Sequence, residues 1–389
     1  MPVFVRKIDL LECTRCGKCR EVCQSYKCFM NESFSPRGRL KLIYTFYAGE
    51  ITQSNSFDQR ILSCMLCGFC QNICPLEIDL PMLIYKARAD MKKKKFFYFL
   101  KYFSLYPHLF FSLLKIFRNS FISEKLIKKF PKNQFLQKYL TFKEDQINQK
   151  FLKTYSVVKP KGRVAVFLGC STKYLMPSIG KSLISLLNKI KYEVILPEQL
   201  CCGAPLLSAG FKEDSIKLAK KNLEIYKAFN IEGVVTPCPT CAHFLRDVYS
   251  ELLNENLTIL NIEDLLNENL AEKEISMEQQ SVCFHPSCHT INYIRDNQKI
   301  LNLLKKQGFR EIQQKKGCCG FAGLFSFLFE KQSMDILREK VLEYEKNDMI
   351  VTSCPNCIIQ FKFAMKNKKI FHYIEVIEKS YLKGEKNAG

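Results

Sequence analysis

Short apolar runs alternate with amphipathic stretches throughout the C-terminal half of the chain. The runs consist of successive apolar residues, which is typical of strands buried on both faces. The predicted strands are 164–168, 233–236, 281–284 and 349–352. The stretches repeat apolar residues every three or four positions, which indicates helices. The predicted helices are 179–189, 214–229, 300–306 and 332–344. Strands that alternate with helices predict α/β units with parallel strands.

This alternation occurs twice, about 117 residues apart, which indicates a domain duplication rather than a solenoid. In each copy the last predicted strand runs directly into a C-P-x-C sequence, and a pair of adjacent cysteines precedes the second helix. Sites of parallel α/β units form in the loops after the carboxyl ends of the strands. We therefore expect the chemistry of both copies to lie in these cysteine-bearing loops.

The 20 cysteines indicate the class of protein. An even number of cysteines would suit disulfides in a secreted protein. Residues 1–11 read MPVFVRKIDLL, in which Arg6, Lys7 and Asp9 interrupt the apolar core that a signal peptide needs. We therefore expect a cytoplasmic protein with reduced thiols, and thiolates are the ligands that soft metals prefer.

Two copies of the spacing C-x2-C-x2-C-x3-C lie near the N-terminus. This is the ligand run of bacterial [4Fe–4S] proteins, in which the fourth cysteine binds the other cluster. The spacing therefore predicts two ferredoxin-type [4Fe–4S] clusters with crossed ligand sets. The first set is Cys13, Cys16, Cys19 and Cys74, and the second set is Cys64, Cys67, Cys70 and Cys23.

Zinc is the main alternative for these two runs. Zinc sites usually use pairs of C-x2-C ligands, whereas each run is a triplet followed by a fourth cysteine. Gly17 and Gly68 supply small residues where the backbone turns tightly around a cluster. Pro75 follows the second run, as in bacterial ferredoxins, but Gln24 takes that position after the first run. All four ligands of each set remain, so we regard this departure as minor.

The segment between the two runs is roughly 40 residues long, which is more than a small ferredoxin needs. Residues 39–47 within it are predicted to form a helix. We therefore expect the helical ferredoxin domain of large oxidoreductase subunits rather than a compact β-rich ferredoxin.

Each copy of the C-terminal repeat carries five cysteines in the same order, with spacings that differ by at most one residue between the copies. The order is a single cysteine, an adjacent pair followed by glycine, and the C-P-x-C sequence. The first module contains Cys170, Cys201, Cys202, Cys238 and Cys241. The second module contains Cys288, Cys318, Cys319, Cys354 and Cys357.

Adjacent cysteines do not fit one tetrahedral metal ion well, but they can bridge neighbouring irons of a larger cluster. Gly203 and Gly320 allow the backbone to turn sharply beside such a cofactor. The modules are therefore predicted to hold up to two further iron–sulfur clusters, because soft ligands suit this chemistry. A disulfide between the paired cysteines and a purely structural role are the alternatives.

Four other residues with metal-binding side chains lie near these motifs. Cys283 is in a predicted strand and is expected in the core, whereas Cys28 has no assigned role. His285 and His289 flank Cys288. A histidine beside such a cysteine more often donates a hydrogen bond to the site than binds the metal, and we expect that role here.

These features predict an α+β multidomain protein. Residues 1–91 are expected to form a helical ferredoxin domain with two [4Fe–4S] motifs, and residues 92–160 a basic, aromatic, helical linker. Residues 161–272 and 273–389 are expected to form two duplicated α/β cysteine-rich modules.

Residues 92–132 are rich in lysine, in a chain of net charge +21. The apolar segment 96–117 is interrupted by Lys101, Pro107 and Lys115, and is therefore too polar for a membrane-spanning helix. It predicts two amphipathic pieces hinged at Pro107 that contact the inner face of the cytoplasmic membrane. The alternative is a buried helical linker with a solvated basic face. The aromatic residues cluster with aliphatic residues rather than alternating with basic ones, so we expect no binding to nucleic acid.

The chain resembles, over nearly all its length, the family of glycolate oxidase iron–sulfur subunits, and more broadly the D-type group of heterodisulfide reductase proteins with CCG domains. Five features carry the resemblance. They are CTRCGKC at 13–19, SPRGRL at 35–40, CMLCGFC at 64–70, both Cys-Cys-Gly loops, and HYIEVIE at 372–378.

This resemblance implies an electron-transfer subunit of a 2-hydroxy-acid dehydrogenase complex of the glycolate or lactate type, without a hydroxy-acid site of its own. A FAD-containing dehydrogenase subunit would supply the electrons, and a membrane quinone or cytochrome would accept them. The sequence contains neither a G-x-G-x-x-G nor a C-x-x-C-H motif, which agrees with a supply of electrons from a partner.

Reduction of a disulfide is the alternative function. Both five-cysteine modules are complete. By the same resemblance, complete modules hold noncubane [4Fe–4S] clusters that cleave a disulfide in heterodisulfide reductases, whereas many glycolate oxidase subunits lack some of these cysteines. A structural or regulatory protein without turnover is a third class, and the complete ligand sets argue against it.

Overall fold

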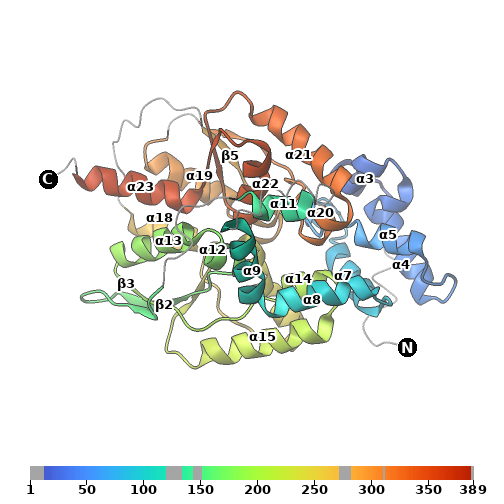
Figure 1. The fold of residues 1–389 in the computed structure, drawn as a ribbon, viewed down its shortest axis with the longest axis horizontal. Helices are drawn as coiled ribbons and strands as arrows, with labels where there is room; N and C mark the ends of the chain where they lie inside the picture. The colour runs from blue at the N-terminus through green and yellow to red at the C-terminus, as the bar shows by residue number, and fades with distance from the viewer. Residues whose placement is uncertain (1–12, 120–133, 143–150, 271–281, 310–311, 387–389) are drawn as a thin grey trace.

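The computed structural model describes residues 13–119, 134–142, 151–270, 282–309 and 312–386. Residues 1–11, on which the prediction of a cytoplasmic protein rests, lie outside these ranges, as do the basic residues between 120 and 132. The helices of the N-terminal segment form one end of the molecule, and the C-terminal helix α23 lies at the other (Figure 1). Two units that combine helices with a sheet lie between them, so the predicted fold class is confirmed.

The N-terminal segment contains only helical elements among its described residues, as predicted. They are α2 (Lys18–Glu21), α3 (Gln24–Phe29), the 3-10 helix η1 (Glu32–Phe34), α4 (Pro36–Tyr47), α5 (Asn55–Leu62), α6 (Phe69–Asn72) and α7 (Leu80–Asp90). The predicted helix over 39–47 is the greater part of α4. Ser35 caps α4 by accepting a hydrogen bond from the Gly38 amide, and Pro36 occupies the first turn, where no amide donor is required.

The linker forms three helices and a short strand within its described residues. They are α8 (Lys95–Leu105), α9 (Pro107–Asn119), α11 (Gln134–Leu140) and β1 (Thr154–Tyr155). The predicted break is confirmed, because α9 begins at Pro107. Both long helices bury one face: Phe96 stacks on Phe327 with ring centroids 4.8 Å apart, and Phe111 stacks on Tyr174 at 5.0 Å.

The first module contains a four-stranded sheet in the order β1-β3-β2-β4, in which β2 is parallel to β3 and β4, and β1 is antiparallel to β3. Its strands are β2 (Gly162–Val166), β3 (Tyr192–Ile195) and β4 (Gly233–Val235). Its helices are α12 (Cys170–Tyr174), α13 (Pro177–Lys189), α14 (Ala204–Ser208), α15 (Lys212–Lys227), α16 (Pro239–His243), the π-helix η2 (Phe244–Val248), α17 (Tyr249–Leu253) and α18 (Ile262–Asn269).

The second module repeats this plan with an all-parallel sheet in the order β6-β5-β7-β8. Its strands are β5 (Val282–His285), β6 (Ile312–Gln314), β7 (Met349–Thr352) and β8 (Lys369–His372). Its helices are the π-helix η3 (Thr290–Ile294), α19 (Asn297–Lys306), α20 (Leu324–Leu328), α21 (Glu330–Tyr344), α22 (Pro355–Ala364) and α23 (Tyr373–Lys386). In the first module a single bridge between Val234 and Ile259 takes the place of β8.

The two modules share one hydrophobic core. Helix α13 of the first module packs on α23 of the second, and α18 packs on α19. Val164 and Leu183 from the first module belong to the same buried cluster as Phe284 and Ile374 from the second. The ferredoxin helices extend a different core into the first module, where Ile43 and Ile84 lie in one buried cluster with Leu206. These cores hold the cysteine-bearing loops of all three units together.

Candidate metal centres

The first predicted ligand set surrounds one cavity at the N-terminal end of the molecule. This cavity is lined by Cys13, Cys16, Cys19 and Cys74. Burial raises the pKa of Cys19 to about 11, so a metal would have to displace a proton from this thiol. Gly17 has a φ of +86°, the left-handed conformation that glycine adopts without strain, and it directly precedes α2 at the edge of the cavity.

The second predicted set surrounds the adjacent cavity. This cavity is lined by Cys23, Cys64, Cys67 and Cys70. The structure thus brings the fourth cysteine of each run to the triplet of the other run, which is the crossed arrangement predicted from the spacing. Burial raises the pKa of Cys67 and Cys70 well above its usual range. Four thiols around one small cavity are the donor chemistry that an iron–sulfur cluster requires.

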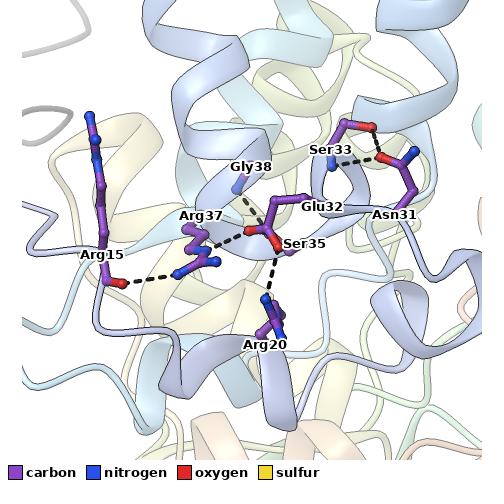
Figure 2. Close-up of polar contacts among 8 residues, drawn as sticks. All are labelled: Arg15, Arg20, Asn31, Glu32, Ser33, Ser35, Arg37 and Gly38. Atoms are coloured by element: carbon purple, nitrogen blue, oxygen red, sulfur yellow. Dashed lines mark hydrogen bonds and ion pairs between the residues drawn. The ribbon is translucent and has the colours of Figure 1, made fainter.

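The SPRGRL segment holds the loop of the first cavity. Glu32 forms an ion pair with Arg37, and also with Arg20 at 3.3 Å (Figure 2). Nη1 of Arg37 donates a hydrogen bond to the Arg15 carbonyl, 3.0 Å away, within the Cys13–Cys16 loop. A Cβ on Gly38 would lie 2.0 Å from the Glu32 carbonyl oxygen, so only glycine fits this turn.

Arg39 of the same segment serves the second cavity. Its side chain is 1% exposed, and its Nη1 lies 3.9 Å from Cys23 Sγ. Its Nη2 donates hydrogen bonds to the Ser25 and Ser63 hydroxyls, and its Nε donates to the Arg60 carbonyl. In the sequence this segment carried only a family resemblance, and no role was predicted for Arg39.

Arg88 is a second buried arginine whose role the sequence did not predict. From α7, it donates hydrogen bonds to the carbonyls of Ile61, Leu62 and Cys64, the last at 2.7 Å. It also reaches the Ser208 carbonyl of the first module, 3.0 Å away. Arg88 therefore fixes the loop that carries Cys64 and ties this loop to a different domain. No sequence motif marks it, because its partners are backbone carbonyls distant in the chain.

The five cysteines of the first module form one continuous chain of sulfur contacts. The order along it is Cys170, Cys201, Cys202, Cys241 and Cys238. Hydrogen bonds from Cys201 and Cys241 lower the pKa of the central Cys202 thiol. Gly203 has a φ of +91°, and a Cβ there would lie 2.6 Å from Ser215 Oγ. This agrees with the sharp turn predicted beside the pair.

The second module repeats the arrangement. The order of contacts is Cys288, Cys318, Cys319, Cys357 and Cys354. Cys357 Sγ lies 3.3 Å from Cys319 Sγ, and hydrogen bonds from Cys318 and Cys357 lower the pKa of Cys319. Gly320 is left-handed, with a φ of +82°. All 20 cysteines lie within the described residues, and none forms a disulfide there.

A buried lysine accompanies the second module. Lys138 of α11 is 1% exposed, and its Nζ lies 3.4 Å from Ser333 Oγ. Burial lowers the pKa of Lys138 to about 8, and the nearby Cys319 opposes this effect. Within the described residues no carboxylate forms an ion pair with Lys138. Buried charges are normally paired, so this cation fits a site that carries negative charge, as thiolate-bound clusters do.

The remaining predicted residues lie close to the second module. Cys283 is buried within β5, which confirms its place in the core, and Cys28 packs beside α21 with its Sγ 4.0 Å from the Gln332 carbonyl. His289 Nδ1 lies 3.5 Å from Cys288 Sγ, and burial lowers the pKa of His289 to about 3. His285 is fully buried, and its Nδ1 lies 2.6 Å from the Tyr344 hydroxyl.

The second ferredoxin cavity adjoins the second module. Cys67 packs in one cluster with Cys288 and Cys318, and the thiol of Cys288 contributes to the raised pKa of Cys67. Asn292 Nδ2 donates a hydrogen bond to the Cys67 carbonyl at 2.7 Å, and Tyr293 Oη donates to Leu66 at 3.2 Å. A Cβ on Gly68 would lie 2.8 Å from the Tyr293 ring. Glycine at this position therefore permits close contact between the two domains.

Comparison with known families identifies both kinds of cysteine motif. A 4Fe-4S dicluster domain matches residues 9–78, and a Cysteine-rich domain (CCG) matches twice, at residues 164–246 and 282–362. These matches lie within the predicted segments, whose boundaries stay predictions. The ligand sets also stay predictions, although the structure gathers each of them.

Several curated proteins are similar to this chain. The probable glycolate oxidase iron-sulfur subunit of Bacillus subtilis is 25% identical over 92% of this chain and 90% of that protein. Lactate utilization protein A of Halalkalibacterium halodurans is 28% identical over 55% of this chain and 96% of that protein. A subunit of the fumarate reductase (CoM/CoB) of Methanothermobacter marburgensis is 23% identical over 83% of this chain and 62% of that protein.

A solved structure shares the fold. The crystal structure of a hypothetical protein from Helicobacter pylori matches with a TM-score of 0.52 and 13% identity, over 89% of this chain and 68% of that chain. At this identity the likeness concerns the fold alone. Among the described residues, no helix combines the length and the apolar character needed to cross a membrane.

Proposed function

Since the chain belongs to the family of glycolate oxidase iron–sulfur subunits, we propose that it is the electron-transfer subunit of a 2-hydroxy-acid dehydrogenase complex. Like the iron–sulfur proteins of this kind, it joins a 4Fe-4S dicluster domain to two cysteine-rich domains. A FAD-containing partner would oxidise a hydroxy acid of the glycolate or lactate type, and a membrane quinone or cytochrome would accept the electrons. Iron–sulfur clusters, when bound, carry electrons one at a time, whereas the substrate gives up two.

The contact between Cys67 and the second module is the observation that carries this proposal. It makes the second ferredoxin cavity and the second module neighbours in space, although they are far apart in the chain. The first cavity adjoins the second, because the thiol of Cys19 contributes to the raised pKa of Cys70. Cys16 of the first cavity is the exposed thiol of the series. A partner protein that binds at this end would contact the first cavity, and Cys67 places the second cavity next to the second module. A protein that carries electrons without a substrate site needs metal centres that are neighbours in this way.

The outer faces of α8 and α9 support contact with a membrane acceptor. Seven large hydrophobic side chains of these helices and of the residue between them are between 48% and 65% exposed: Tyr98, Phe99, Tyr102, Tyr106, Leu109, Leu113 and Ile116. A patch of this kind marks an interaction site. Lys92, Lys94 and Lys95 lie exposed at its start, and Lys94 also donates to Asn55, whereas Lys93 is half-buried and donates to backbone carbonyls. Basic residues beside an exposed apolar face suit an anionic lipid surface.

The membrane part is tested by sedimentation with anionic vesicles at low and high salt. Phe99→Ser combined with Tyr102→Ser should weaken binding even at high salt, because it removes apolar contact. Leu342→Ser is the matched control, since Leu342 is 72% exposed on a different helix. A wild-type chain that stays in the supernatant, alone and with its partner, contradicts membrane contact.

The main proposal is tested by anaerobic purification, iron and sulfide analysis, and electron paramagnetic resonance after reduction through a copurified flavoprotein and a 2-hydroxy acid. Cys64→Ser should remove one ferredoxin signal and perturb the other, because the crossed sets share one fold. Cys28→Ser is the control, since Cys28 belongs to neither set. Zinc in place of iron, or clusters that no flavoprotein partner reduces, would contradict the proposal.

Disulfide reduction is the second candidate, and the completeness of both five-cysteine chains favours it. Hydrogen bonds lower the pKa of Cys202 and Cys319, and thiolates are the reactive form in thiol–disulfide chemistry. The isolated chain, chemically reduced, should cleave a heterodisulfide if this candidate is correct. Loss of that reaction in Cys319→Ser, together with no reduction by a flavoprotein, would replace the main proposal with this one.

A further inference from the structure

The two modules differ at one buried position next to their cysteines. His285 lies three residues before Cys288, at the end of β5, and Phe167 lies three residues before Cys170. Both side chains are 0% exposed. The duplicated fold thus places an imidazole in the second module where the first module has only a hydrocarbon ring.

The imidazole of His285 has one nitrogen in use and one without a partner. Nδ1 lies 2.6 Å from the Tyr344 hydroxyl, and the ring packs edge-on against Phe361, with centroids 4.9 Å apart. Nε2 is buried and has no hydrogen-bond partner among the described residues. A buried nitrogen left in this way is unfavourable, so its retention calls for a partner that the protein alone does not supply.

Two thiols, those of Cys319 and Cys357, lie close to the His285 ring. One ligand atom each from His285, Cys319 and Cys357 fall within 4.8 Å of one another. Nitrogen and sulfur ligands bind a metal such as zinc at about 2.0–2.3 Å, so ligands of one metal are roughly 4 Å apart. Metal-binding histidines usually have their other ring nitrogen hydrogen-bonded, as Nδ1 is to Tyr344. The geometry is that of a mixed histidine–cysteine site.

We propose that His285 is a metal ligand through Nε2, and that it shares one metal of the second module with Cys319 and Cys357, whereas the first module binds through cysteine alone. This inference rests on the proposed function only in requiring a metal centre in the second module. Both modules supply five thiols, so this neutral imidazole would add a ligand to the second module without adding negative charge to its centre.

The test is pulsed electron paramagnetic resonance on the whole chain, with and without 15N-labelled histidine. The wild-type protein should show a directly bound nitrogen that changes with the label, and His285→Phe should abolish this coupling and lower the metal content of the second module. His372→Phe is the matched control, since His372 is also 0% exposed and its Nε2 also lacks a partner among the described residues. His289→Phe controls for a histidine that lies near Cys288.

The outcomes separate the inference from the proposed function. Full iron content without nitrogen coupling overturns the histidine ligand and leaves electron transfer intact. Zinc in the second module, with a nitrogen among its neighbours by X-ray absorption and lost in His285→Phe, supports the ligand and contradicts an iron–sulfur cluster there. A second module that binds no metal overturns the inference. Tyr344→Phe should keep the metal but shift the coupling, because it removes only the group that orients Nδ1.

Discussion

Replacement of Arg88 by methionine is expected to release the Cys64 loop. Methionine keeps most of the volume of the side chain but removes all five hydrogen bonds, at distances between 2.7 and 3.3 Å. The carbonyls of Ile61, Leu62, Cys64 and Ser208 would lose this donor, although that of Ile61 also accepts from the Ser63 amide. The ferredoxin domain would also lose a direct link to the first module.

The expected loss of unfolding free energy is about 3 kcal/mol. A buried carbonyl without a donor costs about 1–3 kcal/mol, and this cost applies to three of the four carbonyls, because Ile61 keeps the Ser63 amide as a donor. We use the low end of this range, about 1 kcal/mol per carbonyl, because the substitution also removes a buried charge, which offsets part of the loss. Burial lowers the pKa of Arg88 to about 10, which shows that the protein disfavours its charged form. Arg88→Lys should lose nearly as much, since an ammonium group lacks the planar fork that reaches several carbonyls.

Denaturant unfolding of the metal-free chain measures this loss, and iron analysis of the reconstituted protein measures the effect on the second cavity. Arg338→Met is the control, because the Arg338 side chain is 70% exposed. Arg88→Met should lose about one [4Fe–4S] equivalent of iron, whereas Arg338→Met should lose none. If Arg88→Met unfolds at the same denaturant concentration as the wild type and keeps all its iron, the role of Arg88 in the Cys64 loop is refuted.

Three further predictions concern single side chains. Gly38→Ala should deplete iron from the first cavity, because the new Cβ would lie 2.0 Å from the Glu32 carbonyl; an unchanged iron content contradicts this. Arg39→Lys should lower the potential of the centre that Cys23 helps to hold, as measured by redox titration, because the guanidinium lies 3.9 Å from Cys23 Sγ. Burial raises the pKa of Glu263 from 4.5 to about 7, so the stability from its protonated form is complete below pH 4.5 and lost as pH rises through 7. Unfolding at pH 5 and pH 8 should therefore differ by up to about 3 kcal/mol from this group, and Glu263→Gln should remove that difference.

The spacing of cysteines carried most of the information about the candidate sites. Three ligands of each cluster are close in sequence, and the fourth cysteine of such a run binds the other cluster. The spacing C-x2-C-x2-C-x3-C was therefore sufficient to predict both sets that the structure gathers around its two cavities. The four apolar runs also predicted β2, β4, β5 and β7, because a strand buried on both faces leaves a continuous apolar segment. Periodicity located the long helices for the same local reason.

Strands such as β3 and β6 were missed, because they contain polar residues and do not form a continuous apolar run. Strand β3 contains Glu193, which pairs with Arg163 at 2.8 Å, and β6 ends in two glutamines. Their place in the sheets depends on partners far away in the chain. The face formed by α8 and α9 was ambiguous for a related reason: an amphipathic segment does not tell which face meets the protein. The structure shows one face packed and the other exposed.

The sequence by itself determined which residues can bind metal and how they group, because each ferredoxin run is closely spaced and the order of five cysteines occurs twice. Only the tertiary structure decided that the ferredoxin runs meet the second module. Cys67 and Cys288 are distant in the chain, and the packing of η3 against the ferredoxin domain makes them neighbours. The role of Arg88 depends on tertiary structure in the same way, because the carbonyls that it binds come from separate elements. The proposed role of His285 does too, because the two thiols near it are distant in the chain. Local spacing records short-range chemistry, whereas contacts between domains depend on burial that no single segment encodes.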